Sequence, residues 1–124
     1  MNLVEEYLAL VSAVVSYRET VYDGATANDH NRKVRKMRAI ATEIEKNSPA
    51  LKYDFFGLLS NESNEIRLWI AHHILEVMNY DKPCRKVAFQ VIRHKARTDK
   101  TASGFGEKVW LKQWYKTHPK DRWI

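Results

Sequence analysis

Residues 64–77 have the sequence NEIRLWIAHHILEV, and this stretch decides the fold class. On a helix with about 100° between residues, it would present two largely apolar faces and one polar arc. The first face holds Ile66, Ile70, His73 and Val77, and the second holds Arg67, Ala71, Ile74 and Met78. The polar arc holds Glu65, Trp69, His72, Glu76 and Asn79. The pattern predicts a central helix that other helices flank on at least two sides.

In the rest of the chain, the distribution of glycine and proline is typical of an all-α protein. Glycine and proline are scarce and fall mainly between periodic segments, and nothing has the alternation of a strand. Six helices are predicted, over residues 2–22, 29–46, 49–59, 62–79, 82–97 and 104–117. Short connections make sequential helices antiparallel neighbours, and pairs that recur about every 40 residues favour a stacked helical repeat. A compact six-helix bundle would give a similar pattern.

The composition is that of an ordinary soluble globular domain, with 44% hydrophobic and 29% charged residues. We predict one domain over residues 1–117 and a short, coiled C-terminal tail over residues 118–124. Cys84 is the only cysteine, which excludes an intramolecular disulfide and cysteine-rich zinc modules. Glu5 and Glu6 stand where a secretory signal needs positive charge, and no apolar stretch is long enough to span a bilayer. We therefore expect a cytoplasmic protein without a membrane partner.

The polar residues of the 64–77 stretch have structural interpretations. His73 lies on an apolar face, where a hydrogen-bonded core histidine is more common than a ligand. His72 and Glu76 lie one turn apart, and no second pair has the spacing that a zinc site needs, so we expect a surface pair. Arg67 also falls on an apolar face, and a buried guanidinium needs fixed acceptors, so we expect it to bond Asn61.

Residues 55–77, FFGLLSNESNEIRLWIAHHILEV, resemble a HEAT-type helical repeat: a first helix, a polar turn residue at Asn61, and then a helix with Arg67 six positions later. In that family the turn residue is usually Asp, and its bond to the basic residue links stacked repeats. Here Asn61 replaces the ion pair with a hydrogen bond. The resemblance implies a right-handed α-α superhelix made of three antiparallel helix pairs.

A wider resemblance covers roughly residues 1–117. ANDHNRK at 27–33, IRLWIAHHIL at 66–75 and SGFGEKVWLKQW at 103–114 are similar to a small bacterial family of unknown function with a HEAT-like fold. Members of this family are similar in layout to immunity proteins that are encoded beside bacterial toxins. The resemblance implies no catalytic residues.

Catalytic motifs are missing from the sequence as well. GFG at residues 104–106 is too short for a phosphate-binding loop, and the serines lie in no recognisable triad motif. Cys84 is expected to be a buried, inert thiol. We therefore predict a protein that is not an enzyme and has no catalytic residue, metal ligand or cofactor.

The C-terminal third is strongly basic. Residues 82–124 contain twelve Lys and Arg against three Asp and Glu, a formal charge of +9. On the helix predicted over 82–97, the basic stripe comprises Lys82, Lys86, Arg93 and Arg97, with Phe89 inside it, either covered by the last helix or exposed among cations. Such a surface favours an anionic partner.

Two functional hypotheses follow. The first is a protein-binding module, in its specific form an immunity or antitoxin-like protein that masks a partner such as a cognate toxin with an acidic surface. Its predicted partner-binding residues are Trp69, His72, Glu76, Lys82, Lys86, Phe89, Arg93 and Arg97. The alternative is a helical repeat that binds nucleic acid through the basic C-terminal face.

Overall fold

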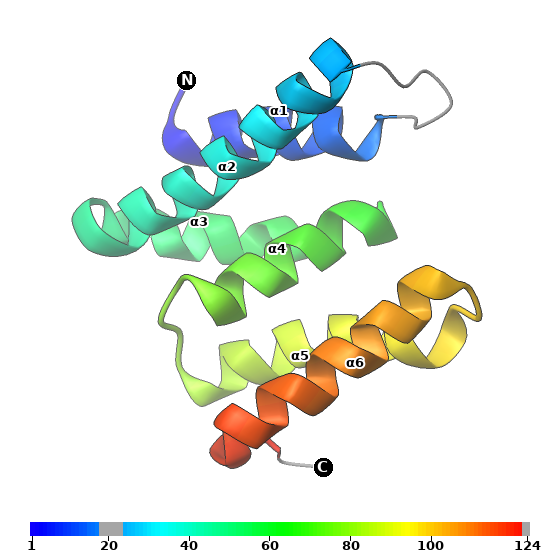
Figure 1. Cartoon of the computed structure of the whole chain (residues 1–124). Coiled ribbons are helices and arrows are strands. Elements are labelled where there is room, and N and C mark those ends of the chain that lie inside the picture. Colours follow the sequence, from blue (N-terminus) through cyan, green and yellow to red (C-terminus); the bar gives the residue numbers. More distant parts are fainter. Residues whose placement is uncertain (18–23, 123–124) are drawn as a thin grey trace.

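The computed structural model describes residues 1–17 and 24–122, and side chains there except those of 24–26. This part of the chain is helical and has no strand, which confirms the all-α prediction with six α-helices (Figure 1). The α-helices are α1 (Leu3–Val15), α2 (Gly24–Asn47), α3 (Lys52–Gly57), α4 (Asn64–Glu76), α5 (Lys82–Thr98) and α6 (Ala102–Thr117). Short 3-10 turns occupy Pro49–Leu51, Leu58–Ser60 and Pro119–Asp121.

Side-chain caps explain where several helices begin. The Ser63 hydroxyl accepts a hydrogen bond from the backbone of Ile66, and the Asp81 carboxylate accepts one from the backbone of Cys84. Pro83 follows Asp81 within the first turn of α5, where the missing N–H costs no helical hydrogen bond. α5 therefore begins at Lys82, which confirms the helix start predicted at residue 82.

The first connection differs from the prediction. α1 ends at Val15 instead of continuing to residue 22, and α2 begins at Gly24 instead of residue 29. The sequence predicts that Tyr17 belongs to the first helix, because the three- and four-residue spacing of apolar residues continues through it. This spacing indicates which residues are buried but does not determine where a helix ends. Val21, which was also assigned to that helix, lies outside the described residues. The predicted third helix is similarly interrupted, because only Lys52–Gly57 of it is α-helical.

The helices lie in two layers. In Figure 1, α2, α4 and α6 form the nearer layer, and α1, α3 and α5 lie behind them. Sequential neighbours pack together, α1 on α2 and α5 on α6, while α4 also contacts α1, α2 and α5. α4 is therefore the central helix. Both the stacked-hairpin and the compact-bundle interpretations fit this arrangement, and the right-handed superhelix stays a prediction.

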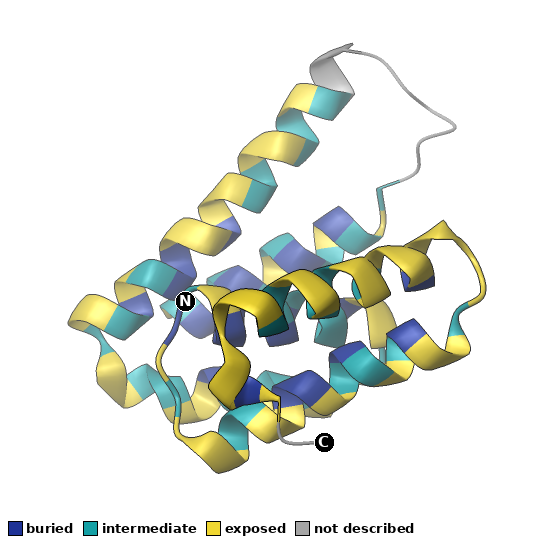
Figure 2. Ribbon diagram, turned by 60° about the horizontal axis from the view of Figure 1, so that its bottom comes forward, coloured by how far each residue is buried: buried dark blue, intermediate teal, exposed yellow. Residues whose placement is uncertain are grey.

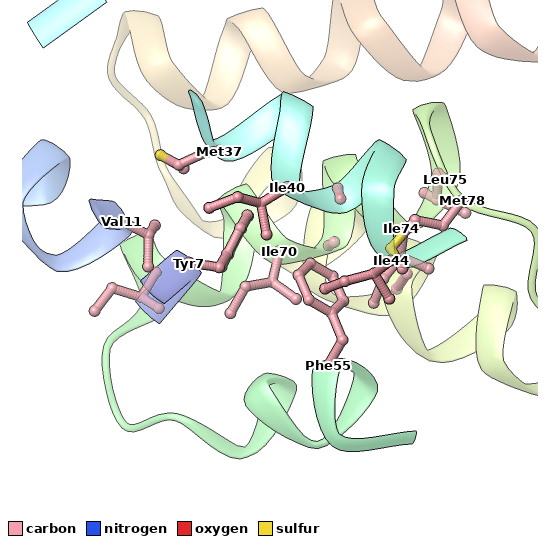
Figure 3. Packing of buried hydrophobic residues seen from close by; sticks show 14 of the residues in the cluster. Tyr7, Val11, Met37, Ile40, Ile44, Phe55, Ile70, Ile74, Leu75 and Met78 are labelled. Carbon is pink, nitrogen blue, oxygen red and sulfur yellow. The ribbon is translucent and has the colours of Figure 1, made fainter. Parts of the chain in front are cut away.

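The core surrounds the buried faces of α4. Tyr7, Phe55 and Ile70 are fully buried, and the rings of Tyr7 and Phe55 meet edge to face at 4.8 Å between centroids (Figure 3). Val11, Met37, Ile44 and Ile74 are fully buried as well. On the other side of α4, Phe89 and Ile92 of α5 are also fully buried and join the same cluster. Apolar residues thus hold α4 from both sides, in agreement with its helical wheel.

Up to residue 122, where the described part of the chain ends, the C-terminal segment is more ordered than the coil predicted over residues 118–124. Pro119–Asp121 form a 3-10 turn, and only 8% of Asp121 is exposed. Its carboxylate accepts hydrogen bonds from the Arg85 guanidinium at 2.5 Å and from the Trp114 indole N–H at 2.8 Å. The chain therefore packs against the α5 and α6 pair as far as Asp121, because a buried carboxylate needs such partners.

Candidate partner-binding groove

A groove of about 490 Å³ opens between α2, α4 and α6. Its apolar lining consists of Val34 from α2, Leu68 and Trp69 from α4, and Trp110 from α6. Its charged and polar lining consists of Arg35, Arg38, Glu65, His72, His73, Glu76, Ser103 and Glu107. Because each of the three helices contributes an apolar residue and a charged residue, the groove depends on their packing and not on a single element.

Trp69 lies at the junction of this groove with a second hollow. The second hollow, which lies between α1, the start of α2 and the start of α4, shares Glu65, Trp69 and Ser103 with the groove. Trp69 itself is half-buried, and its ring lies 6.1 Å from that of His73. Trp69 is therefore partly covered by the protein and also lines the groove, a combination common in interface tryptophans.

A chain of charged side chains links the three groove helices. Arg38 of α2 lies 3.5 Å from Glu76, and Glu76 accepts a hydrogen bond from His72 Nδ1 at 3.0 Å. On its other side, His72 Nε2 lies 2.8 Å from the carboxylate of Glu107 on α6. The Trp110 ring meets the His72 ring edge to face at 4.5 Å. The sequence predicted the His72 and Glu76 pair on an exposed surface, but the His72 side chain is only 18% exposed.

The two carboxylates keep His72 protonated. Burial alone would lower the pKa of His72, but its hydrogen bonds to Glu107 and Glu76 outweigh burial and raise the pKa to about 9. The same hydrogen bond lowers the pKa of Glu76. At neutral pH, His72 is therefore an imidazolium that donates from both ring nitrogens, and it holds α4 against α6.

His73 has the opposite environment. Only 5% of it is exposed, its Nδ1 lies 2.6 Å from the Tyr7 hydroxyl, and burial lowers its pKa to about 4. The sequence predicted a buried, hydrogen-bonded histidine, and the structure places His73 in that position. Tyr7 of α1 is the partner that sequence reasoning did not identify. Two adjacent histidines thus carry different charges at neutral pH because only one faces carboxylates.

Arg67 bonds Asn61 as expected, but the bond goes to the backbone carbonyl of Asn61 and is local to the turn before α4. Its guanidinium donates to the backbone carbonyl of Asn61 at 3.4 Å and to the side chain of Asn64. The side-chain oxygen of Asn61 instead accepts from the backbone of Ser63 at 2.8 Å. These contacts belong to the turn that leads into α4, so Arg67 and Asn61 order this turn.

The basic stripe of α5 lies outside the groove. No described residue of the groove lining belongs to it. The predicted partner surface therefore consists of two separate parts, the groove and the α5 stripe. Lys82, Lys86 and Arg97 are exposed, and Arg93 donates to the Tyr115 hydroxyl at 2.7 Å. Phe89 is fully buried beneath the α6 aromatics, which corrects its assignment as a partner-binding residue. Of the two alternatives for Phe89, covered by the last helix or exposed among cations, the structure shows the first.

Sequence reasoning missed Arg38 and Glu107, which place His72 in the groove. A signal for Glu107 does exist, because it is one of only three acidic residues in a segment of charge +9. Such a rare acid tends to have a specific cationic partner. Which partner it meets depends on how α4 and α6 pack, and periodicity within one helix does not contain that information.

The groove offers no assembled metal site in the described part of the chain, where no three His, Cys, Asp or Glu side chains are placed to hold an ion. Both ring nitrogens of His72 already bond carboxylates. Of the helices in residues 1–17 and 24–122, none is long and apolar enough to cross a membrane. No family model, curated protein or solved structure matches the chain.

Proposed function

We propose that this protein is a non-enzymatic protein-binding module that holds a segment of a partner protein in the groove between α2, α4 and α6. The observation that carries this proposal is the combination of an apolar lining with charged side chains that the fold already holds in place. A preformed site of this kind binds without a large ordering cost. An immunity or antitoxin-like role, with a cognate toxin as the partner, is the specific form that we propose.

The groove lining indicates the chemistry of the partner segment. Leu68, Trp69 and Trp110 fit apolar anchor side chains, which usually supply most of the binding energy at an interface. Arg35 is exposed at the groove and forms no ion pair with any residue that the structure describes. Arg38, by contrast, already faces Glu76. We therefore propose a segment with apolar anchors and a carboxylate that meets Arg35.

Affinity purification of the tagged full-length protein at native expression tests the proposal. We expect a stoichiometric protein partner, whose affinity falls about 30-fold for Trp69→Ala, as for interface hot spots. Arg35→Glu should also weaken binding, and its exposed position makes it the variant that leaves the fold intact. The matched control is Tyr53→Ala, because Tyr53 is an aromatic residue outside the groove that is 85% exposed.

The outcome is informative in both directions. Loss of the partner with Trp69→Ala and Arg35→Glu, together with its retention by Tyr53→Ala, supports the groove as the binding site. Failure to recover any stoichiometric partner, or equal recovery by all three variants, contradicts it. Circular dichroism of each variant separates a binding defect from unfolding.

A further inference from the structure

The outer face of α6 carries positive charge that the C-terminal third does not neutralise. The three acidic residues of the C-terminal third all form ion pairs with other residues: Asp99 with Lys95, Glu107 with His72 and Asp121 with Arg85. Among the residues that the structure describes, no carboxylate lies within ion-pair distance of Arg93, Arg97, Lys108, Lys112 or Lys116. A row of cations without counter-charges raises the local positive potential and attracts an anionic ligand.

Four of these cations define a surface that we call the α6 ridge: Lys108, Lys112 and Lys116 along the helix, with Arg97 beside Lys108. The three lysines recur every four residues and are exposed, so they follow one side of the helix in steps of about 6 Å. A hollow of about 270 Å³ is lined by Arg93, Ala96, Arg97 and Lys108, and a hollow of about 420 Å³ by Lys112, Tyr115, Lys116 and Arg122. Much of α6 is exposed in Figure 2.

An exposed aromatic ring stands at the beginning of this ridge. Phe105 is 67% exposed although it lies within α6, and Val109, one turn later, is 42% exposed. Phe105 precedes Lys108 by three residues and Lys112 by seven, so the ring and the lysines share one side of the helix. The protein leaves this ring uncovered while it buries Phe89 completely.

We propose that the α6 ridge binds single-stranded nucleic acid, with the lysines on successive phosphates and Phe105 stacked on a base. Each nucleotide carries one negative charge, so a row of cations neutralises several phosphates at once and releases their counterions. Surfaces that bind single strands combine such a basic track with aromatic stacking platforms. Phe105 selects a single strand over a duplex, because only an unpaired base offers its face to the ring.

This surface is independent of the groove. Of the described residues that line the groove, none belongs to the ridge, and Trp69 is not among the residues of the two basic hollows. The substitution Trp69→Ala should therefore leave nucleic-acid binding unchanged. The ridge is one exposed part of the predicted basic C-terminal face.

Fluorescence polarisation with the full chain tests this assignment. The probes are a labelled single strand of about 15 nucleotides and the matching duplex, in about 50 and 200 mM salt. We expect binding to the single strand at low salt and a steep loss at high salt. The triple variant Lys108→Ala/Lys112→Ala/Lys116→Ala should bind at least about tenfold more weakly and lower the salt slope by about 2.

The charge-matched control is Arg32→Ala/Lys36→Ala/Lys46→Ala, which removes three exposed cations from α2. It should stay within about twofold of the wild type, since distant exposed charges are screened. Phe105→Ala should weaken single-strand binding about tenfold and leave duplex binding unchanged. The assignment is overturned if the wild type does not bind at low salt or if both triple variants lose affinity equally. It is also overturned if Phe105→Ala binds the single strand normally, or if an acidic peptide binds as tightly as the oligonucleotide.

Discussion

The bond between His72 and Glu107 gives the protein a measurable dependence of stability on pH. The folded pKa of His72 is about 9 and the ordinary value is 6.5. Because the folded pKa is higher, folded His72 holds its proton more tightly than the unfolded chain does. The resulting stabilisation is fully present below pH 6.5 and is lost as the pH rises through about 9. At about 1.4 kcal/mol for each pKa unit, His72 contributes about 3 kcal/mol at the acidic end of this range.

Glu107→Gln removes the carboxylate that contributes most to this elevation of the pKa, while it keeps the size of the side chain. We expect Glu107→Gln to lower the free energy of unfolding by about 2 kcal/mol at pH of about 6 and to approach the wild type near pH 10. Urea unfolding followed by circular dichroism at several pH values measures this difference. Titration of the His72 ring by NMR reports its pKa in both proteins directly.

Glu65→Gln is the matched control. Glu65 is also a carboxylate on the groove, but its side chain is 54% exposed and it pairs with Lys95 at 2.8 Å. Its replacement should change stability by less than about 1 kcal/mol, without a trend between pH 6.5 and 9. A Glu107→Gln effect that does not vary with pH would refute the proposed histidinium, and so would a His72 pKa near 6.5 in the wild type.

Three further predictions concern packing. Gly104→Ala should destabilise the protein by about 1 to 3 kcal/mol, because a Cβ there would collide with the backbone of Asp99. Gly106→Ala should instead stabilise α6 by about 0.5 to 1 kcal/mol, because its Cβ would point into open space. Thermal unfolding of the two variants measures both effects. Tyr7→Phe should cost about 1 to 2 kcal/mol at neutral pH in urea unfolding, because it leaves the buried ring nitrogen of His73 unpaired. Asp121→Ala should lower the melting temperature by several degrees, since it leaves the Arg85 guanidinium and the Trp114 indole N–H without their acceptor; an unchanged value would mean that the segment after α6 is dispensable.

Much of the helical framework could be predicted because it depends on patterns within single segments. The two apolar faces of residues 64–77 predicted a central helix, and the structure buries Ile70 and Ile74 from both faces. The predicted start of α5 at residue 82 is also correct, because Asp81 caps the helix and Pro83 is tolerated in its first turn. Helix ends without such a signal were less accurate, since the apolar spacing of the first helix continues beyond Val15.

The candidate site was less predictable because it forms between helices. The helical wheel places His72 on the polar arc, but the arc faces a groove whose opposite wall belongs to α6. Glu107 is 35 residues away, and its register against α4 depends on how the α5 and α6 aromatics pack. Phe89 was ambiguous for the same reason, because only the position of Trp110 and Tyr115 decides that it is covered.

The same packing that buries Phe89 also divides the basic surface. The aromatic side of α6 packs on α5, and Arg93 donates to the Tyr115 hydroxyl. The opposite side of α6, which carries Lys112 and Lys116, remains exposed. The apolar side of α6 therefore fixes the direction in which its lysines point. Under the proposal, α6 is held to its own fold by the aromatics on one side and meets the anionic ligand with the cations on the other. This arrangement connects the amphipathic pattern of residues 103–114 to the proposed nucleic-acid surface through one physical cause, the burial of the α6 aromatics against α5.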